Sequence, residues 1–169
     1  MHRAILNAAC AFLLLIIQSN VIFAFGPAFE PQHAVIAAVY AAIYAVPMIP
    51  ATISVLIIAM LYDQSASGPP GLYALVIMGV FLIIRWMNTR FRAQHIVLII
   101  FYAILACSMA FVALVAGSAL YYPDSRIPEL AMREGWRHIL ATALFMPITA
   151  WFIEALSRLW LKRRNTGLS

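Results

Sequence analysis

The chain has 169 residues, of which 65% are hydrophobic and only 10% are charged, and its mean hydropathy is +0.95. Soluble domains are roughly a quarter charged and about half apolar, so this composition excludes a soluble globular protein and predicts an integral membrane protein. The net charge of +5 comes from basic residues at the ends of apolar runs, which indicates membrane orientation rather than nucleic-acid binding. No polar block is long enough to fold separately, so residues 1–169 are predicted to form one membrane domain.

Six apolar stretches, taken in chain order, predict six membrane-spanning helices. They cover about residues 4–25, 33–48, 50–62, 71–88, 95–120 and 138–161. The first has no small-residue cleavage site at its end and is interpreted as an uncleaved helix. The second and third are shorter than the about 20 residues that a full crossing needs. They are predicted either to cross a thinned bilayer, with a turn at 47–50, or to form a re-entrant hairpin.

Positively charged residues form two groups, separated by two predicted spans. The first group follows the fourth span and the second follows the sixth: Arg85, Arg90 and Arg92, then Arg158, Lys162, Arg163 and Arg164. Cytoplasmic segments are enriched in such residues, which favours two crossings within 33–62 and places both termini in the cytoplasm. Residues 121–138 then lie on the outer side, as the only connection large enough to dock a protein. From Pro128 onward they are predicted to form a short helix on the membrane surface.

A stiff polar turn, DQSASGPPG, separates the third and fourth spans. Proline fixes φ and glycine permits positive φ, so this composition is typical of a tight turn with a set direction. Asp63 opens it at the end of the third span. Its carboxylate is predicted to accept hydrogen bonds from backbone amides in the turn or at the start of the next helix. The alternative is direct contact with a ligand or partner, because an ionisable residue at membrane depth often marks a functional site.

The last two spans carry further candidate features. Pro147 predicts either a packing kink or a hinge. Glu154 lies four residues before Arg158, the favourable order for a helical ion pair; a partner or proton role is the alternative. Small residues recur every three or four positions in the fifth span, which predicts a close helix-packing face. These residues are Ala103, Ala106, Ala110, Ala113 and Gly117.

The turn resembles a motif of the rod-shape-determining MreD family, in which a helix ends in a D-L-L-S-G-x-P-x-G-L-x-A-L run. The matching positions are Asp63, Pro69, Gly71, Leu72, Ala74 and Leu75. The family's Ser-Gly falls on Ala66 and Ser67, so small residues are kept while their identities shift. The chain length, the basic patch after the fourth span and the final helix with its proline and basic tail are also similar to that family.

The resemblance implies an all-α membrane protein, a six-helix transmembrane bundle similar to the S-components of energy-coupling-factor transporters. It implies a non-enzymatic subunit, without a cofactor, of the peptidoglycan-synthesising cell-elongation machinery in the bacterial cytoplasmic (inner) membrane. The implied partners are an MreC-like bitopic membrane protein and, indirectly, the MreB filament, RodA and a penicillin-binding transpeptidase. The residues expected to shape a partner surface or pocket are Asp63, Ser67, Gly68, Pro69, Gly71, Pro147 and Glu154.

Two other functions are weighed against this one. A substrate-binding subunit of a vitamin or small-molecule transporter fits the short second and third spans and the aspartate-bearing turn, although polar ligands need several convergent polar groups and few lie in the spans. An enzyme is expected least, because general acid–base chemistry needs two positioned groups and Asp63 and Glu154 are predicted on opposite sides of the membrane. Cys10 and Cys107 are isolated, so no metal site is predicted.

Overall fold

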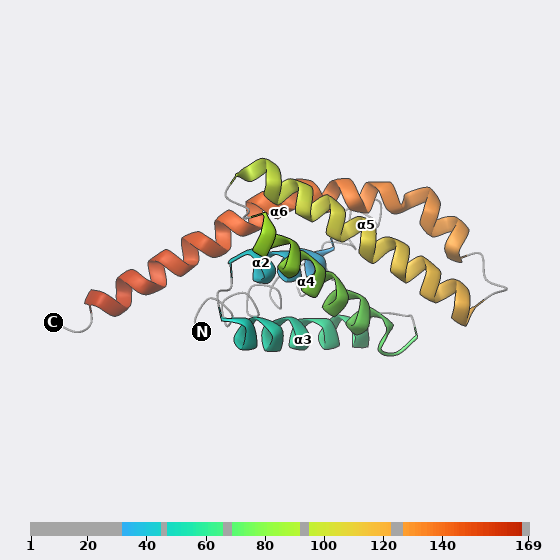
Figure 1. The fold of residues 1–169 in the computed structure, drawn as a ribbon, viewed down its shortest axis with the longest axis horizontal. Coiled ribbons are helices and arrows are strands. Elements are labelled where there is room, and N and C mark those ends of the chain that lie inside the picture. Colours follow the sequence, from blue (N-terminus) through green and yellow to red (C-terminus); the bar gives the residue numbers. More distant parts are fainter. Residues whose placement is uncertain (1–31, 45–46, 66–68, 92–94, 123–126, 167–169) are drawn as a thin grey trace.

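A computed structural model of the chain describes residues 32–44, 47–65, 69–91, 95–122 and 127–166, with the side chains of 65, 127–132, 134 and 156–166 outside the description. The described residues form helices and no strand. The five helices are α2 (His33–Tyr44), α3 (Met48–Ser65), α4 (Leu72–Arg90), α5 (Ile96–Tyr121) and α6 (Ile127–Thr166) (Figure 1). The all-α class is therefore confirmed for this part of the chain. The first predicted span, at residues 4–25, lies outside it.

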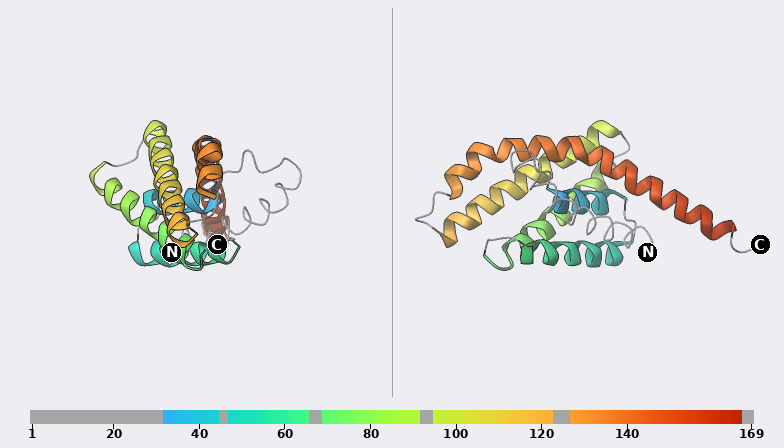
Figure 2. Two further views of the ribbon diagram at one scale, coloured as in Figure 1. Left: turned by 90° about the vertical axis from the view of Figure 1, so that its right-hand side faces the viewer. Right: turned by 180° about the vertical axis from the view of Figure 1, so that it is seen from behind.

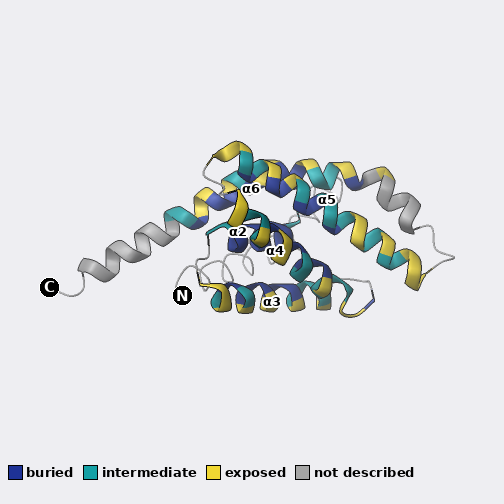
Figure 3. Cartoon of the chain, in the orientation of Figure 1, coloured by how far each residue is buried: buried dark blue, intermediate teal, exposed yellow. Residues whose placement is uncertain are grey.

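Within the described ranges, three helical segments are long and apolar enough to cross a membrane: Leu72–Arg90, Ile96–Tyr121 and Gly135–Ala155. Large apolar side chains are exposed on α3, α4, α5 and α6, and Figure 3 shows the exposed positions along these helices. Apolar surface of this extent suits contact with lipid rather than water. The expectation of a membrane protein is consistent with both observations.

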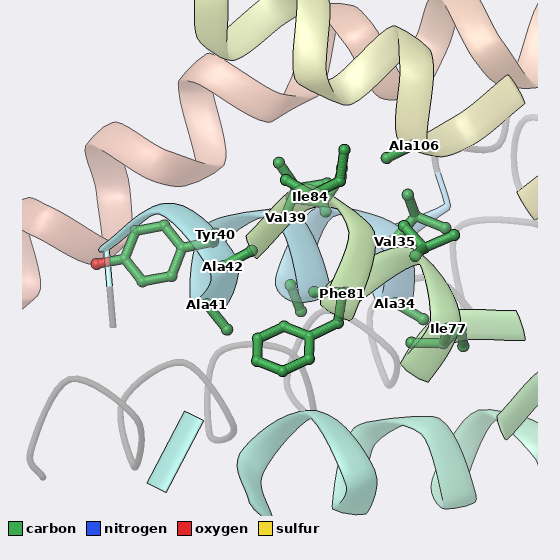
Figure 4. Close-up of a cluster of buried hydrophobic side chains, with 14 of the residues drawn as sticks. Ala34, Val35, Val39, Tyr40, Ala41, Ala42, Ile77, Phe81, Ile84 and Ala106 are labelled. Carbon is green, nitrogen blue, oxygen red and sulfur yellow. The ribbon is translucent and has the colours of Figure 1, made fainter. Parts of the chain in front are cut away.

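The short helix α2 lies at the centre of the bundle and contacts all four other described helices (Figures 1 and 2). Every residue from His33 to Ala42 is buried, which is typical of a helix that is apolar on all sides. Its alanines allow neighbouring backbones to approach closely, and Val39 packs near Phe81 and Ile84 of α4 (Figure 4). At about 18 Å, α2 is shorter than the about 30 Å hydrocarbon layer.

Helix α3 differs from its predicted span of 50–62. It begins at Met48 and ends at Ser65, so the turn predicted at 47–50 is wrong for Met48 to Pro50. Pro50 lies in the first helical turn, where its missing N–H has no intrahelical acceptor to lose. Asp63 consequently lies in the last turn of α3 rather than beyond its end.

Helix α6 corrects the prediction for residues 121–138. A separate surface helix from Pro128 was expected, but the helix is continuous from Ile127 to Thr166 over 40 residues. Pro128 falls in its first turn, a position that tolerates proline. The predicted span 138–161 is therefore the middle of one long helix, which bends along its length (Figure 1).

The small-residue face predicted on α5 is confirmed in part. Ala103, Ala106 and Ala110 are buried, whereas Ala113 is exposed, which makes that assignment wrong. Gly117 receives the Leu72 side chain of α4: a Cβ built on this glycine would lie 2.6 Å from Leu72 Cδ1. This face therefore packs within the chain's own bundle.

Candidate functional site

Asp63 closes the turn between α3 and α4. Its Oδ2 accepts a hydrogen bond from the Gly71 N–H at 2.6 Å, and its Oδ1 accepts bonds from the N–H groups of Tyr73 at 3.0 Å and Ala74 at 3.4 Å. These amides belong to the start of α4, where backbone donors have no intrahelical acceptor. A carboxylate there also interacts favourably with the positive end of the helix. The predicted capping role of Asp63 is confirmed; a direct ligand or partner contact stays a prediction.

The sequence of the turn explains why the carboxylate and the amides meet. Gly71 has φ of 86°, the left-handed region that glycine adopts without the penalty of a Cβ. Pro69 is buried, and its carbonyl accepts a bond from the Leu72 N–H at 3.2 Å. Asp63, Pro69 and Gly71 are thus brought together as predicted. Ser67 and Gly68 lie outside the described residues.

A second cluster surrounds the C-terminal end of α2. Arg85 Nη1 of α4 donates to the Ala42 carbonyl at 3.1 Å, and Asn88 Nδ2 donates to the Ile43 carbonyl at 3.5 Å. The last carbonyls of a helix lack intrahelical donors, and a cation is favourable at this end. Sequence reasoning interpreted Arg85 only as an orientation marker. No local signal links it to a carbonyl 43 residues earlier.

Glu154 of α6 joins the same end of α2. The buried Tyr40 donates its hydroxyl to Glu154 Oε2 at 3.4 Å, and Tyr40 packs on Tyr44 with ring centroids 4.9 Å apart. The predicted pairing of Glu154 with Arg158 stays a prediction, because the Arg158 side chain lies outside the description. Sequence reasoning missed Tyr40, since a tyrosine in an apolar run reads as ordinary packing.

The other end of α2 is tied to α6 as well. The Gln32 N–H donates to Thr142 Oγ1 at 2.9 Å, and the Thr142 hydroxyl donates to the His138 carbonyl at 2.7 Å. His33, the first residue of α2, is 7% exposed, and its Nδ1 has no hydrogen-bond partner within the described structure. From its place at the end of a predicted span, His33 is expected to be exposed, which is wrong, and no local pattern in the sequence pairs Thr142 with Gln32.

The residues predicted to shape a site therefore fall into two clusters with different tasks. Asp63, Pro69 and Gly71 fix the start of α4, whereas Glu154 lies at the end of α2. Pro147 lies inside α6, about two helical turns before Glu154. These groups fix helix ends and directions through hydrogen bonds. Within the part of the chain that the structure describes, no group of three or more His, Cys, Asp or Glu residues is placed to hold a metal ion.

Comparison with known proteins provides no further assignment. No protein-family model matches the chain, and no curated protein or solved structure shows significant similarity to it.

Proposed function

We propose that this protein is an MreD-like, non-enzymatic subunit of the bacterial cell-elongation machinery, and that it binds an MreC-like bitopic partner in the inner membrane. The observation that carries the proposal is the turn closed by Asp63. Three motif positions of the MreD resemblance, Asp63, Gly71 and Ala74, join in the hydrogen bonds that build this turn. These three positions of the resemblance thus all help to hold the turn between α3 and α4.

A turn held in this way suits recognition by a protein partner. Binding costs less when the recognised segment is already ordered, and here a carboxylate, a left-handed glycine and a buried proline order it. In the proposed topology both termini are cytoplasmic and six helices form an S-component-like bundle. The turn then faces the outer side of the membrane, where a bitopic partner is within reach.

Purification from native membranes in mild detergent, followed by mass spectrometry of the retained proteins, tests this function. An MreC-like protein, RodA or a penicillin-binding transpeptidase is expected to be recovered, and Asp63→Ala is expected to reduce that recovery. Gly79→Ala is the matched control, because a Cβ at Gly79 meets nothing within 4 Å. Normal rod shape after clean depletion, in a strain without a second copy of the gene, would contradict the proposal.

A second candidate is a substrate-binding transporter subunit, favoured by α2. Interrupted helices whose ends lie inside the protein form substrate sites in many transporters. The short, buried α2 and the unpartnered His33 Nδ1 at its start fit that pattern. Recovery of ATPase subunits or of a bound small metabolite in the same purification would favour this function instead.

A further inference from the structure

Helix α6 contains residues near its middle that favour a bend. Pro147 lacks an N–H and cannot bond to the carbonyl four residues earlier, which promotes a bend. Thr142 bonds back to the His138 carbonyl, and threonines that bond in this way also bend helices. We call residues 127–146 the first limb of α6 and residues 148–166 the second limb. A helix of this kind needs external contacts to hold one angle between its limbs.

The segment around α2 is hydrogen-bonded to each limb, through Gln32 just before the helix and through Tyr40 within it. Thr142 of the first limb accepts the hydrogen bond from the Gln32 N–H, and Glu154 of the second limb accepts the bond from the Tyr40 hydroxyl. The two contacts lie on opposite sides of Pro147. In Figure 4, Tyr40 lies at the edge of the buried cluster and its hydroxyl points away from the other labelled side chains. Helix α2 therefore connects the two limbs across the bend.

The connecting helix is itself held firmly. It is buried along its length, and close-packed interiors resist deformation. Its last carbonyls are bonded by Arg85 and Asn88 of α4. A shift of α4 at this end would therefore carry α2 with it rather than slide past it.

We propose that α2 is a brace that sets the angle of α6 at Pro147, with the Tyr40 hydroxyl as its contact to the second limb. Movement of α4 at the Arg85 end is then transmitted through α2 to the second limb. That limb carries Lys162, Arg163 and Arg164 near the end of the chain. The inference concerns contacts inside the chain and holds whichever partner the protein binds.

Distance measurement by double electron–electron resonance tests the brace in the full-length protein in lipid nanodiscs. Spin labels are placed at position 97, where Val97 of α5 is exposed, and at position 162 of the second limb. Cys10 and Cys107 are replaced by alanine. The parent is expected to give one dominant distance. Tyr40→Phe, which keeps the ring and removes the hydroxyl, is expected to raise the share of a second distance about fivefold.

Tyr121→Phe is the control, because it removes a tyrosine hydroxyl at an exposed position of α5, and it should keep the parent distribution. Adding Pro147→Ala to Tyr40→Phe should restore one narrow distance, since the limbs then form a stiff helix. If Tyr40→Phe fails to fold, Glu154→Ala takes its place with the same expectation. An unchanged distribution in the Tyr40 or Glu154 variant, or equal broadening in Tyr121→Phe, would overturn the proposal.

Discussion

Helices α2 and α3 are neighbours in the chain and both are short and apolar, yet their environments differ. Helix α2 is buried on every side, whereas α3 buries one face, which includes Ala51, Val55 and Ala59, and exposes Ile53 and Ile57. In a membrane, the apolar character of a helix does not tell whether it packs against protein or against lipid, because core side chains and lipid tails are equally apolar. The size of the side chains distinguishes the two environments: α2 is rich in alanine, whereas the outer face of α3 carries large side chains. The comparison teaches that burial follows packing here rather than hydropathy.

The largest expected effect comes from making the same change in both helices. Ile36 of α2 is 1% exposed and Ile57 of α3 is 49% exposed. Ile36→Ala leaves a cavity in a core that cannot collapse fully, and it is expected to cost about 2–5 kcal/mol of unfolding free energy. Ile57→Ala should change stability by no more than about 0.5 kcal/mol. Reversible unfolding in bicelles measures the stability of both variants. Equal losses of stability would show that α2 and α3 do not differ in packing.

A pair of glycines extends the comparison to α4 and α6. A Cβ added at Gly135 of α6 would overlap the Phe111 ring of α5, whereas one added at Gly79 of α4 meets nothing within 4 Å. Gly135→Ala is therefore expected to lower stability by about 1–3 kcal/mol through overpacking. Gly79→Ala should raise it by about 0.5–1 kcal/mol, because alanine favours the helix. Thermal unfolding of both variants in one detergent shows whether each substitution raises or lowers stability. A stabilising Gly135→Ala would contradict the close contact between Gly135 and Phe111.

The exposed helix α3 makes its main polar contribution through Asp63. Asp63→Ala removes the acceptor of the Gly71, Tyr73 and Ala74 amides and is expected to cost about 1–2 kcal/mol. Hydrogen exchange of these three amides should accelerate, while exchange in the middle of α4 stays slow. Asp63→Asn keeps one side-chain oxygen, so the exchange rates of these amides should lie between those of the parent and those of Asp63→Ala. Unchanged exchange at all three amides in Asp63→Ala would show that water replaces the carboxylate without loss.

The smallest expected effect separates two threonines that make the same local bond. Thr142 of α6 and Thr52 of α3 both donate to the carbonyl four residues earlier, but Thr142 also accepts the Gln32 N–H. Thr142→Val leaves that amide without its acceptor at a partly buried site and should lower the free energy of unfolding by about 0.5–1.5 kcal/mol. Thr52→Val should stay within about 0.5 kcal/mol. Equal values would mean that the start of α2 needs no acceptor from α6.

Local features of the fold were predictable from the sequence, whereas long-range features were not. The bounds of α4 and α5 follow from apolar runs that end in turn or charged residues, and the Asp63 cap follows from turn chemistry. The burial of α2 depends on which helices surround it, and no periodicity encodes that. The start of α3 was missed because Pro50 reads as a turn residue, although a first helical turn accepts it. Tyr40 and Thr142 acquire their tasks only through contacts more than 100 residues apart.

The position of α2 has a consequence for how the chain is made. The acceptor of the Gln32 amide, just before α2, lies 110 residues further along the chain, and ribosomes add about 5–20 residues per second. Roughly 5–20 seconds therefore pass between the synthesis of Gln32 and that of Thr142. During that time the central helix has neither its second-limb contact nor the cover of α6. Helix α6 is the last of the described helices to be synthesised, so a chain cut short before α6 leaves its central helix without that cover.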